Sequence, residues 1–328
     1  TIKGVMRISS GIASTIACTM GYRGHEGRGW LQPVNIEKEI DSIISEASQE
    51  GFSKVVLSSE YFWESFCFFH DDFCRTKDEY RTFVDKAVSY LDDFEVKIVV
   101  YFRRQDLHFS SLVREYIRSI GNRSQEEIFE AFKPFYHYHT YLSVWQDALG
   151  EENVVYRIYD KDRIGDIADD FMSVIGEECK PAPPGTRDER NANPSLSKDI
   201  CEYLKIAINY ADSNNLSLPA IFHQLLAELS TKETQEDFPE LSEQQALEIV
   251  QLFEKENARL MGVDTEFSVK EFQRLEKNGT IRAEYPGLTA EKAVGIGVET
   301  NVALMQKLAE MNRENRALKT IIKEFKNK

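Results

Sequence analysis

Arginine and serine side chains gather where an apolar strand pattern ends. Arg103 and Arg104 directly follow the apolar run VKIVVYF, and Ser110 and Ser111 lie in the helical pattern that comes next. A guanidinium beside the first N–H groups of a helix can bind a phosphate through paired, charged hydrogen bonds. The alternative is that one arginine pairs with Asp106 or another carboxylate. These residue types therefore favour an anion site here, and the kind of anion stays open.

Two further strand patterns also end in polar residues. The run KVVLSS leads to Glu60, and the run NVVYRIY ends at Tyr159. Ligands of open parallel sheets bind beyond the carboxyl ends of the strands, so both side chains are candidates for the same site as Arg103. The alternatives are a glutamate that caps a helix or forms a salt bridge, and an ordinary tyrosine at the end of a strand.

Short runs rich in valine and isoleucine alternate with helical patterns in the first half of the chain. Continuous apolar runs of this kind are typical of strands that are buried on both faces. The predicted strands cover residues 53–59, 96–102 and 153–159, with a further candidate at 1–9. A helical pattern precedes each of the first three, and the earliest of these patterns ends at Gly51. This order predicts an α/β fold with a parallel sheet flanked by helices.

The pattern changes after a proline-rich segment at residues 179–195, because only helical patterns follow it. The sequence therefore predicts three parts. They are an α/β core over 1–185, a helical region over 186–285 that completes or caps the core, and a long C-terminal helix over 286–328.

Apolar residues in the C-terminal helix follow the heptad spacing of a coiled coil. The seam consists of Leu304, Leu308, Met311, Asn315, Leu318, Ile322 and Phe325. Asn315 falls at an a position, where a buried asparagine sets the register and favours a dimer. The pattern predicts a homo-dimer through residues 304–325, and the alternative is a terminal helix that packs on its own domain.

Composition excludes several classes of protein. The 328 residues carry a net charge of −15, which argues against general binding of nucleic acid or of anionic membranes. No apolar window is long enough to predict a membrane-spanning helix. The five cysteines include no CxxC pair, so we expect reduced thiols, a cytoplasmic location and no structural zinc. His137 and His139 form an HxH in a helical pattern without a carboxylate cluster, and we expect no metal there.

Four segments together resemble the bacterial sulfotransferase family in order and in spacing. They are KVVLSSEYF, VKIVVYFRRQDLHFSSLVREYIR, YHTYLSVWQDALGEENVVYRIYDKDRIGDIADDFMSVIG and NPSLSKDICEYLKIAIN, within residues 35–210. The resemblance implies a P-loop-like sulfotransferase fold that binds 3′-phosphoadenosine 5′-phosphosulfate (PAPS). It also implies transfer of a sulfuryl group to an acceptor hydroxyl, for which a carbohydrate is the family-level expectation, and release of 3′-phosphoadenosine 5′-phosphate (PAP).

The resemblance also implies roles for individual residues. Arg103 and Ser111 match the arginine and serine, eight positions apart, that grip the 3′-phosphate of the nucleotide. Tyr159 resembles the tyrosine that borders the adenine pocket. Glu60 matches the strand-end position of a catalytic base, which would take the proton of the acceptor as its oxygen attacks sulfur.

The sequence departs from the family at the loop that cradles the 5′-phosphosulfate. The family has a loop that resembles KTGTTS, whereas the nearest equivalent here is SSGIAST, which offers Ser14 and Thr15 but no lysine. Backbone amides and hydroxyls can still bind a phosphate. Three explanations stay open: a loop upstream of Thr1, a degenerate loop in which an arginine replaces the lysine, or a protein that has lost catalysis. In the last case the chain would be a scaffold that assembles through its helical C-terminus.

A kinase of similar fold is a weaker alternative, because GxxxxGK[ST] is absent.

Overall fold

The computed structural model of the chain describes residues 3–8, 13, 16, 34–59, 62–63, 76–119, 124–159, 166–178, 196–216, 218, 220–230, 240–261 and 285–326. Contacts between residues divide the chain into two compact units, each made of three stretches. Unit 1 comprises Thr1–Gln105, Phe129–Pro181 and Ile249–Gln273, and unit 2 comprises Asp106–Ile128, Ala182–Glu248 and Arg274–Lys328. This division cuts across the three consecutive parts that the sequence suggests.

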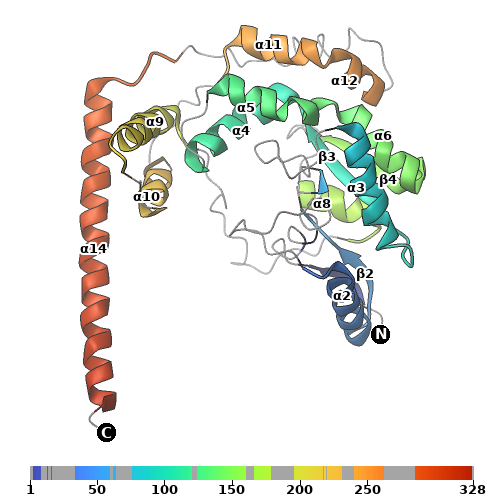
Figure 1. Cartoon of the computed structure of the whole chain (residues 1–328), viewed down its shortest axis with the longest axis horizontal. Coiled ribbons are helices and arrows are strands. Elements are labelled where there is room, and N and C mark those ends of the chain that lie inside the picture. Colours follow the sequence, from blue (N-terminus) through green and yellow to red (C-terminus); the bar gives the residue numbers. More distant parts are fainter. Residues whose placement is uncertain are drawn as a thin grey trace. The chain divides into compact units, whose positions relative to one another are not determined.

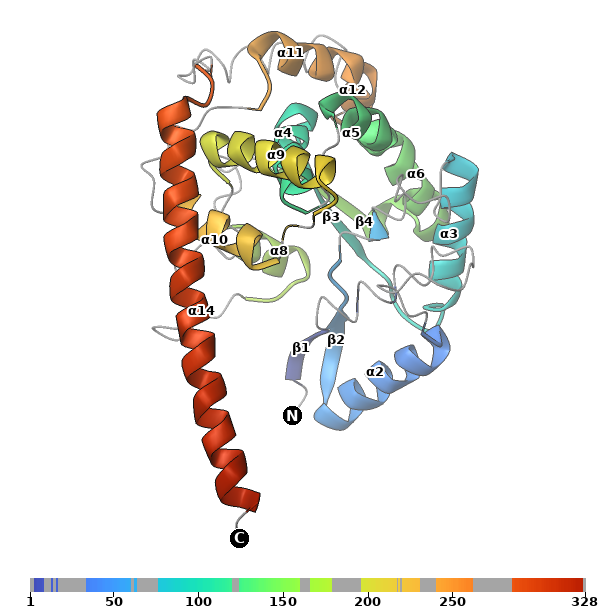
Figure 2. The same cartoon turned by 60° about the vertical axis from the view of Figure 1, so that its left-hand side comes forward.

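All described strands belong to unit 1, and they pair in parallel, two by two. β1 (Lys3–Arg7) pairs with β2 (Phe52–Val56), and β3 (Ile98–Arg103) pairs with β4 (Val154–Tyr159). The four strands predicted from sequence are thereby confirmed, and so is an α/β architecture with parallel strands. The fold is mostly helical, with two small sheets among the described residues in place of the larger sheet that the sequence suggests. Figure 2 shows β1 and β2 side by side, with α2 next to β2.

Favoured capping residues mark both ends of α2 and the start of α3 in unit 1. α2 (Ile36–Glu50) begins after Asn35, whose side chain accepts a hydrogen bond from the Lys38 N–H, and ends at Gly51. Gly51 has a φ of 73°, a left-handed conformation that favours glycine, so the predicted stop is confirmed. α3 (Lys77–Ser89) begins with a capping box of Thr76 and Glu79.

Aromatic side chains form the core of unit 1 beside β3. Phe102 stacks on Tyr138 with ring centroids 4.4 Å apart, and the edge of Trp63 meets Phe102 at 4.8 Å. Trp145 donates a hydrogen bond from Nε1 to the hydroxyl of Tyr80 at 2.8 Å. These contacts join β3 to α3 and to α6 (Tyr138–Leu149), and the buried N–H of Trp145 has the Tyr80 hydroxyl as its acceptor.

A helix from late in the sequence completes unit 1. α12 (Glu254–Met261) packs on α6, and the Asn257 and Gln105 side chains exchange hydrogen bonds of 2.6 and 3.1 Å. The Tyr156 hydroxyl on β4 donates to the carbonyl of Leu260. The remaining described elements of unit 1 are α8 (Ile167–Val174) and the 3-10 helices η2 (Lys133–Tyr136) and η3 (Glu151–Asn153).

Unit 2 is helical. α9 (Lys198–Ser213) and α10 (Ala220–Ser230) pack against the long helix α14 (Ala290–Lys326). α4 (Gln105–Ser119), α5 (Gln125–Phe132) and α11 (Glu243–Leu252) run across the boundaries between the units. The C-terminal half of α14 extends beyond α9 and α10 (Figures 1 and 2).

A buried ionic cluster in unit 2 connects residues that are far apart in the sequence. The carboxylate of Glu240 is fully buried and pairs with Lys198 and, at 3.3 Å, with Arg114. Cys201 is a free thiol nearby, and burial with the charge of Glu240 raises its pKa to about 12. This thiol is therefore unreactive near neutral pH.

Candidate functional site

The carboxyl ends of β3 and β4 place two candidate residues next to each other. Arg103 and Tyr159 are Cα partners at the last paired position of the two strands. Side chains alternate between the faces of a strand, so Arg103 and Tyr159 share one face with the previous same-face pair, Tyr101 and Arg157. Phe102 points to the opposite face, where it packs on the aromatic core.

A hydrogen bond fixes the backbone of Arg103, while its side chain can still bind a ligand. The Tyr138 hydroxyl donates a hydrogen bond of 2.8 Å to the carbonyl of Arg103. The Arg103 side chain is half-buried, and no residue in the described part of the chain forms a hydrogen bond or ion pair with its guanidinium. A half-buried guanidinium at this position can bind an anion with little rearrangement of the backbone.

The other arginine on this face already has a carboxylate partner. Arg157 Nε lies 3.6 Å from the carboxylate of Asp170 on α8, which also accepts a hydrogen bond of 2.6 Å from the Tyr101 hydroxyl. Burial and this hydrogen bond raise the pKa of Tyr101 above its ordinary value. Arg157 is therefore already paired, whereas no described carboxylate forms an ion pair with the Arg103 guanidinium, so Arg103 stays the candidate anion ligand.

The serine predicted to join Arg103 lies on α4. Ser111 is exposed, and it falls in the stretch of α4 that belongs to unit 2, whereas Arg103 belongs to unit 1. Because the two residues lie in different units, binding of one phosphate by both Arg103 and Ser111 stays a prediction.

Three predicted site residues lie outside the described residues: the candidate base Glu60 and the loop residues Ser14 and Thr15. Ala13 and Ile16 of the same segment are described, and both are helical and fully buried. The roles of Glu60, Ser14 and Thr15 therefore stay predictions.

A second polar cluster, which the sequence does not reveal, joins α6 and α12. The Glu256 carboxylate accepts hydrogen bonds from the backbone and the hydroxyl of Thr140, each at 3.0 Å, and lies 3.9 Å from His137 Nδ1. Burial alone would raise the pKa of Glu256, but these interactions outweigh burial and lower it to about 2. Thr140 lies 116 residues from Glu256 in the chain, so no local pattern could have predicted the pair.

Metal ligands do not gather anywhere in the described part of the chain. No group of three or more histidine, cysteine, aspartate and glutamate side chains there could hold a metal ion. Likewise, none of the described helices combines the length and the apolar content needed to cross a membrane.

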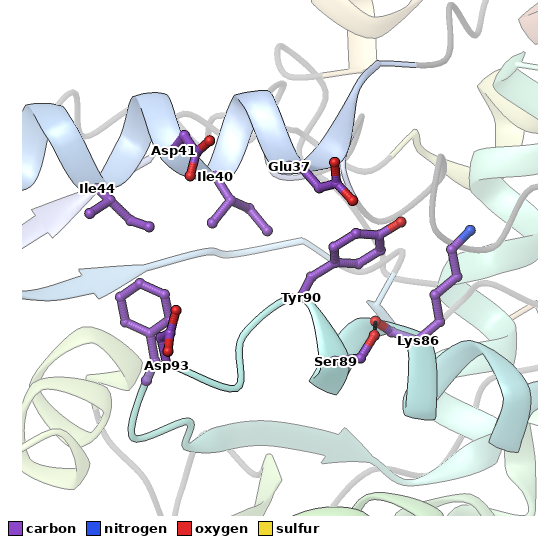
Figure 3. A pocket seen from close by; sticks show the side chains of 9 residues that line it. Glu37, Ile40, Asp41, Ile44, Lys86, Ser89, Tyr90 and Asp93 are labelled. Atoms are coloured by element: carbon purple, nitrogen blue, oxygen red, sulfur yellow. Dashed lines mark hydrogen bonds between the residues drawn. The ribbon is translucent and has the colours of Figure 1, made fainter.

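A cavity of about 450 Å³ lies between α2 and the end of α3. Figure 3 shows Ile40 and Ile44 on the α2 wall and the Tyr90 ring pointing toward Glu37. Phe94, which also lines the cavity, precedes the amino end of β3. Ligands of parallel sheets bind at the opposite, carboxyl end of the strands, so this cavity is not the site predicted around Arg103.

Comparison with known proteins assigns no family to this chain. No family model matches the sequence, and no solved structure matches it. A protein of Archaeoglobus fulgidus, described as uncharacterized, is 34% identical over 122 residues. The match covers 36% of this chain and 30% of that protein, so the chain spans less than a third of the length of this relative.

Proposed function

We propose that this chain binds PAPS and transfers its sulfuryl group to an acceptor hydroxyl on a carbohydrate. The observation that carries the proposal is the half-buried guanidinium of Arg103, which no described residue pairs with, at the carboxyl end of a parallel strand pair. Further support comes from α4, which begins at Gln105, two residues after Arg103. The first N–H groups of this helix supply donors for a phosphate.

The proposed roles are those that the resemblance to the bacterial sulfotransferase family implies for the matching positions of this sequence. Arg103, with Ser111, holds the 3′-phosphate of the nucleotide, and Tyr159 packs against the adenine. The acceptor oxygen attacks sulfur, the new S–O bond forms, and the S–O bond to the 5′-phosphate breaks, so that PAP leaves. Glu60 takes the acceptor proton, and Ser14 and Thr15 bind the 5′-phosphosulfate with backbone amides.

A transfer assay tests the catalytic part of this proposal. The full chain is incubated with sulfur-labelled PAPS and a set of neutral oligosaccharides, and the label on sugar is counted. We expect transfer by the wild-type chain and a loss of at least about a hundredfold in Glu60→Gln, the usual effect of removing a general base. PAP binding by Glu60→Gln serves as the control and is expected to be unchanged. Equal turnover in Glu60→Gln would refute its role as base.

A second candidate function is a non-catalytic assembly module on the same fold. The absence of a lysine from the SSGIAST segment favours it, as do the large exposed apolar residues along α14. Binding of PAP separates the two candidates, because only the first requires a nucleotide site.

A further inference from the structure

We propose that α14 pairs with α14 of a second copy of this chain in a parallel, in-register coiled coil. The first half of α14 is held within unit 2, since Ile296 and Thr300 are buried and Gly297 lies against Tyr203 of α9. The second half extends beyond α9 and α10, as Figures 1 and 2 show.

The exposed apolar residues of the second half continue the face that is buried in the first half. Positions 297, 300, 304, 308, 311, 315 and 318 are three or four apart and therefore line one side of the helix. Leu308, Met311 and Leu318 on this side are each at least half exposed. Coiled-coil pairing buries such a regular seam of large apolar side chains between two helices and so takes it out of water.

The attachment of α14 to unit 2 makes a short coiled coil feasible. Three heptads span about 30 Å, and an isolated helix of this length is only marginally stable in water. Here the nucleus of the helix is already formed, because α9 and α10 pack against α14. Pairing then has to supply only the contacts along the seam.

Asn315 favours a second copy of this chain as the partner and a parallel orientation of the two helices. In a parallel, in-register pair, Asn315 faces Asn315 of the other copy, and the two amides can bond to each other. In an antiparallel pair it would face an apolar d residue, and its amide would be buried without a partner. The charges agree with the parallel arrangement, since Glu314 occupies a g position and Lys319 the following e position.

An apolar helix face can also bind to a lipid surface. Asn315 argues against it, because this amide would enter the apolar layer of the membrane in the middle of the seam. The net charge of −15 also opposes binding to anionic lipids.

Sedimentation equilibrium of the full chain tests the pairing. We expect twice the 37.8 kDa mass of one chain at micromolar concentration. Met311→Glu, in the seam, is expected to weaken dimerisation by at least tenfold. Gln306→Glu adds the same charge at the outward-facing f position and is expected to leave the dimer intact. Circular dichroism of both variants verifies that the chain is folded.

Oxidative cross-linking tests the orientation. Met311→Cys is expected to form a covalent dimer well above the background of the parent cysteines, because parallel pairing brings the two copies of position 311 together. Gln306→Cys is not expected to do so, because position 306 faces outward. A wild-type monomer, a dimer that Met311→Glu does not weaken, equal cross-linking at both positions, or association only on added anionic vesicles would each overturn the proposal. PAP binding is measured separately, so failure here leaves the proposed function standing.

Discussion

Arg103 and Tyr159 are Cα partners at the last paired position of β3 and β4. This register places a guanidinium and a phenol side by side where a parallel strand pair ends, on the face opposite the aromatic core. Two positions earlier on the same face, Arg157 is already paired with Asp170. The difference between the two arginines makes Arg103 the candidate anion ligand.

Tyr138 should fix the strand end that carries Arg103. Tyr138→Phe removes the hydroxyl that donates to the Arg103 carbonyl and leaves that carbonyl without this donor. We expect a loss of about 1 kcal/mol in the free energy of unfolding, measured with urea. PAP binding should weaken as well. Tyr210→Phe on the exposed surface of α9 is the control. Equal effects of the two substitutions would show that the bond to Arg103 has no specific role.

Glu256 should make the stability of unit 1 fall at acid pH. Its pKa is lowered from 4.5 to about 2 in the folded chain. Its contribution is therefore fully present above about pH 4.5 and is lost as the pH falls toward 2. We expect Glu256→Gln to lose on the order of 2 kcal/mol near neutral pH and to flatten the decline below pH 5. Urea unfolding across this range measures both effects, and an unaltered decline in the variant would contradict the account.

Glu240 should be essential for the stability of unit 2. Glu240→Ala leaves Lys198 and Arg114 in a buried site without their shared carboxylate. Removing one partner of a buried ionic cluster typically costs about 3–5 kcal/mol. Glu243→Ala on the exposed start of α11 is the matched control and should change stability by less than about 0.5 kcal/mol. Thermal melts compare the two, and similar losses in both would argue against the cluster.

Two glycines of α14 should respond differently to alanine. A Cβ at Gly295 meets nothing within 4 Å, so Gly295→Ala should stabilise the helix by about 0.5–1 kcal/mol. A Cβ at Gly297 lies 3.1 Å from the Tyr203 hydroxyl, so Gly297→Ala should gain less or lose stability. Thermal unfolding measures the difference. An equal gain in both would mean that α14 does not pack closely on α9.

Local sequence patterns predicted the elements of unit 1 well. The valine- and isoleucine-rich runs predicted β2, β3 and β4. Gly51 predicted the end of α2, because the residue there has a left-handed backbone conformation that glycine adopts readily. The strand-end position of Arg103 followed from the same pattern.

Contacts between residues far apart in the chain could not be predicted from the sequence patterns. Nothing local distinguishes Arg103 from Arg157, because their difference is the carboxylate of Asp170 on a separate helix. The pairing of Glu256 with Thr140 and of Glu240 with Lys198 also joins residues far apart in the chain. Such partners depend on tertiary packing, which periodicity does not encode. Glu60, Ser14 and Thr15 remain predictions because they lie outside the described residues.

Calorimetric titration of the full chain with PAP measures whether Arg103 binds a phosphate of the nucleotide. The wild-type chain and two variants are compared, Arg103→Ala and Arg81→Ala, the latter an exposed arginine of unit 1 that pairs with Asp147. We expect saturable one-to-one binding by the wild-type chain and by Arg81→Ala, and a loss of at least tenfold in affinity in Arg103→Ala. No binding by the wild-type chain, or equal affinity in Arg103→Ala, would contradict the assignment of Arg103 as the nucleotide's phosphate ligand.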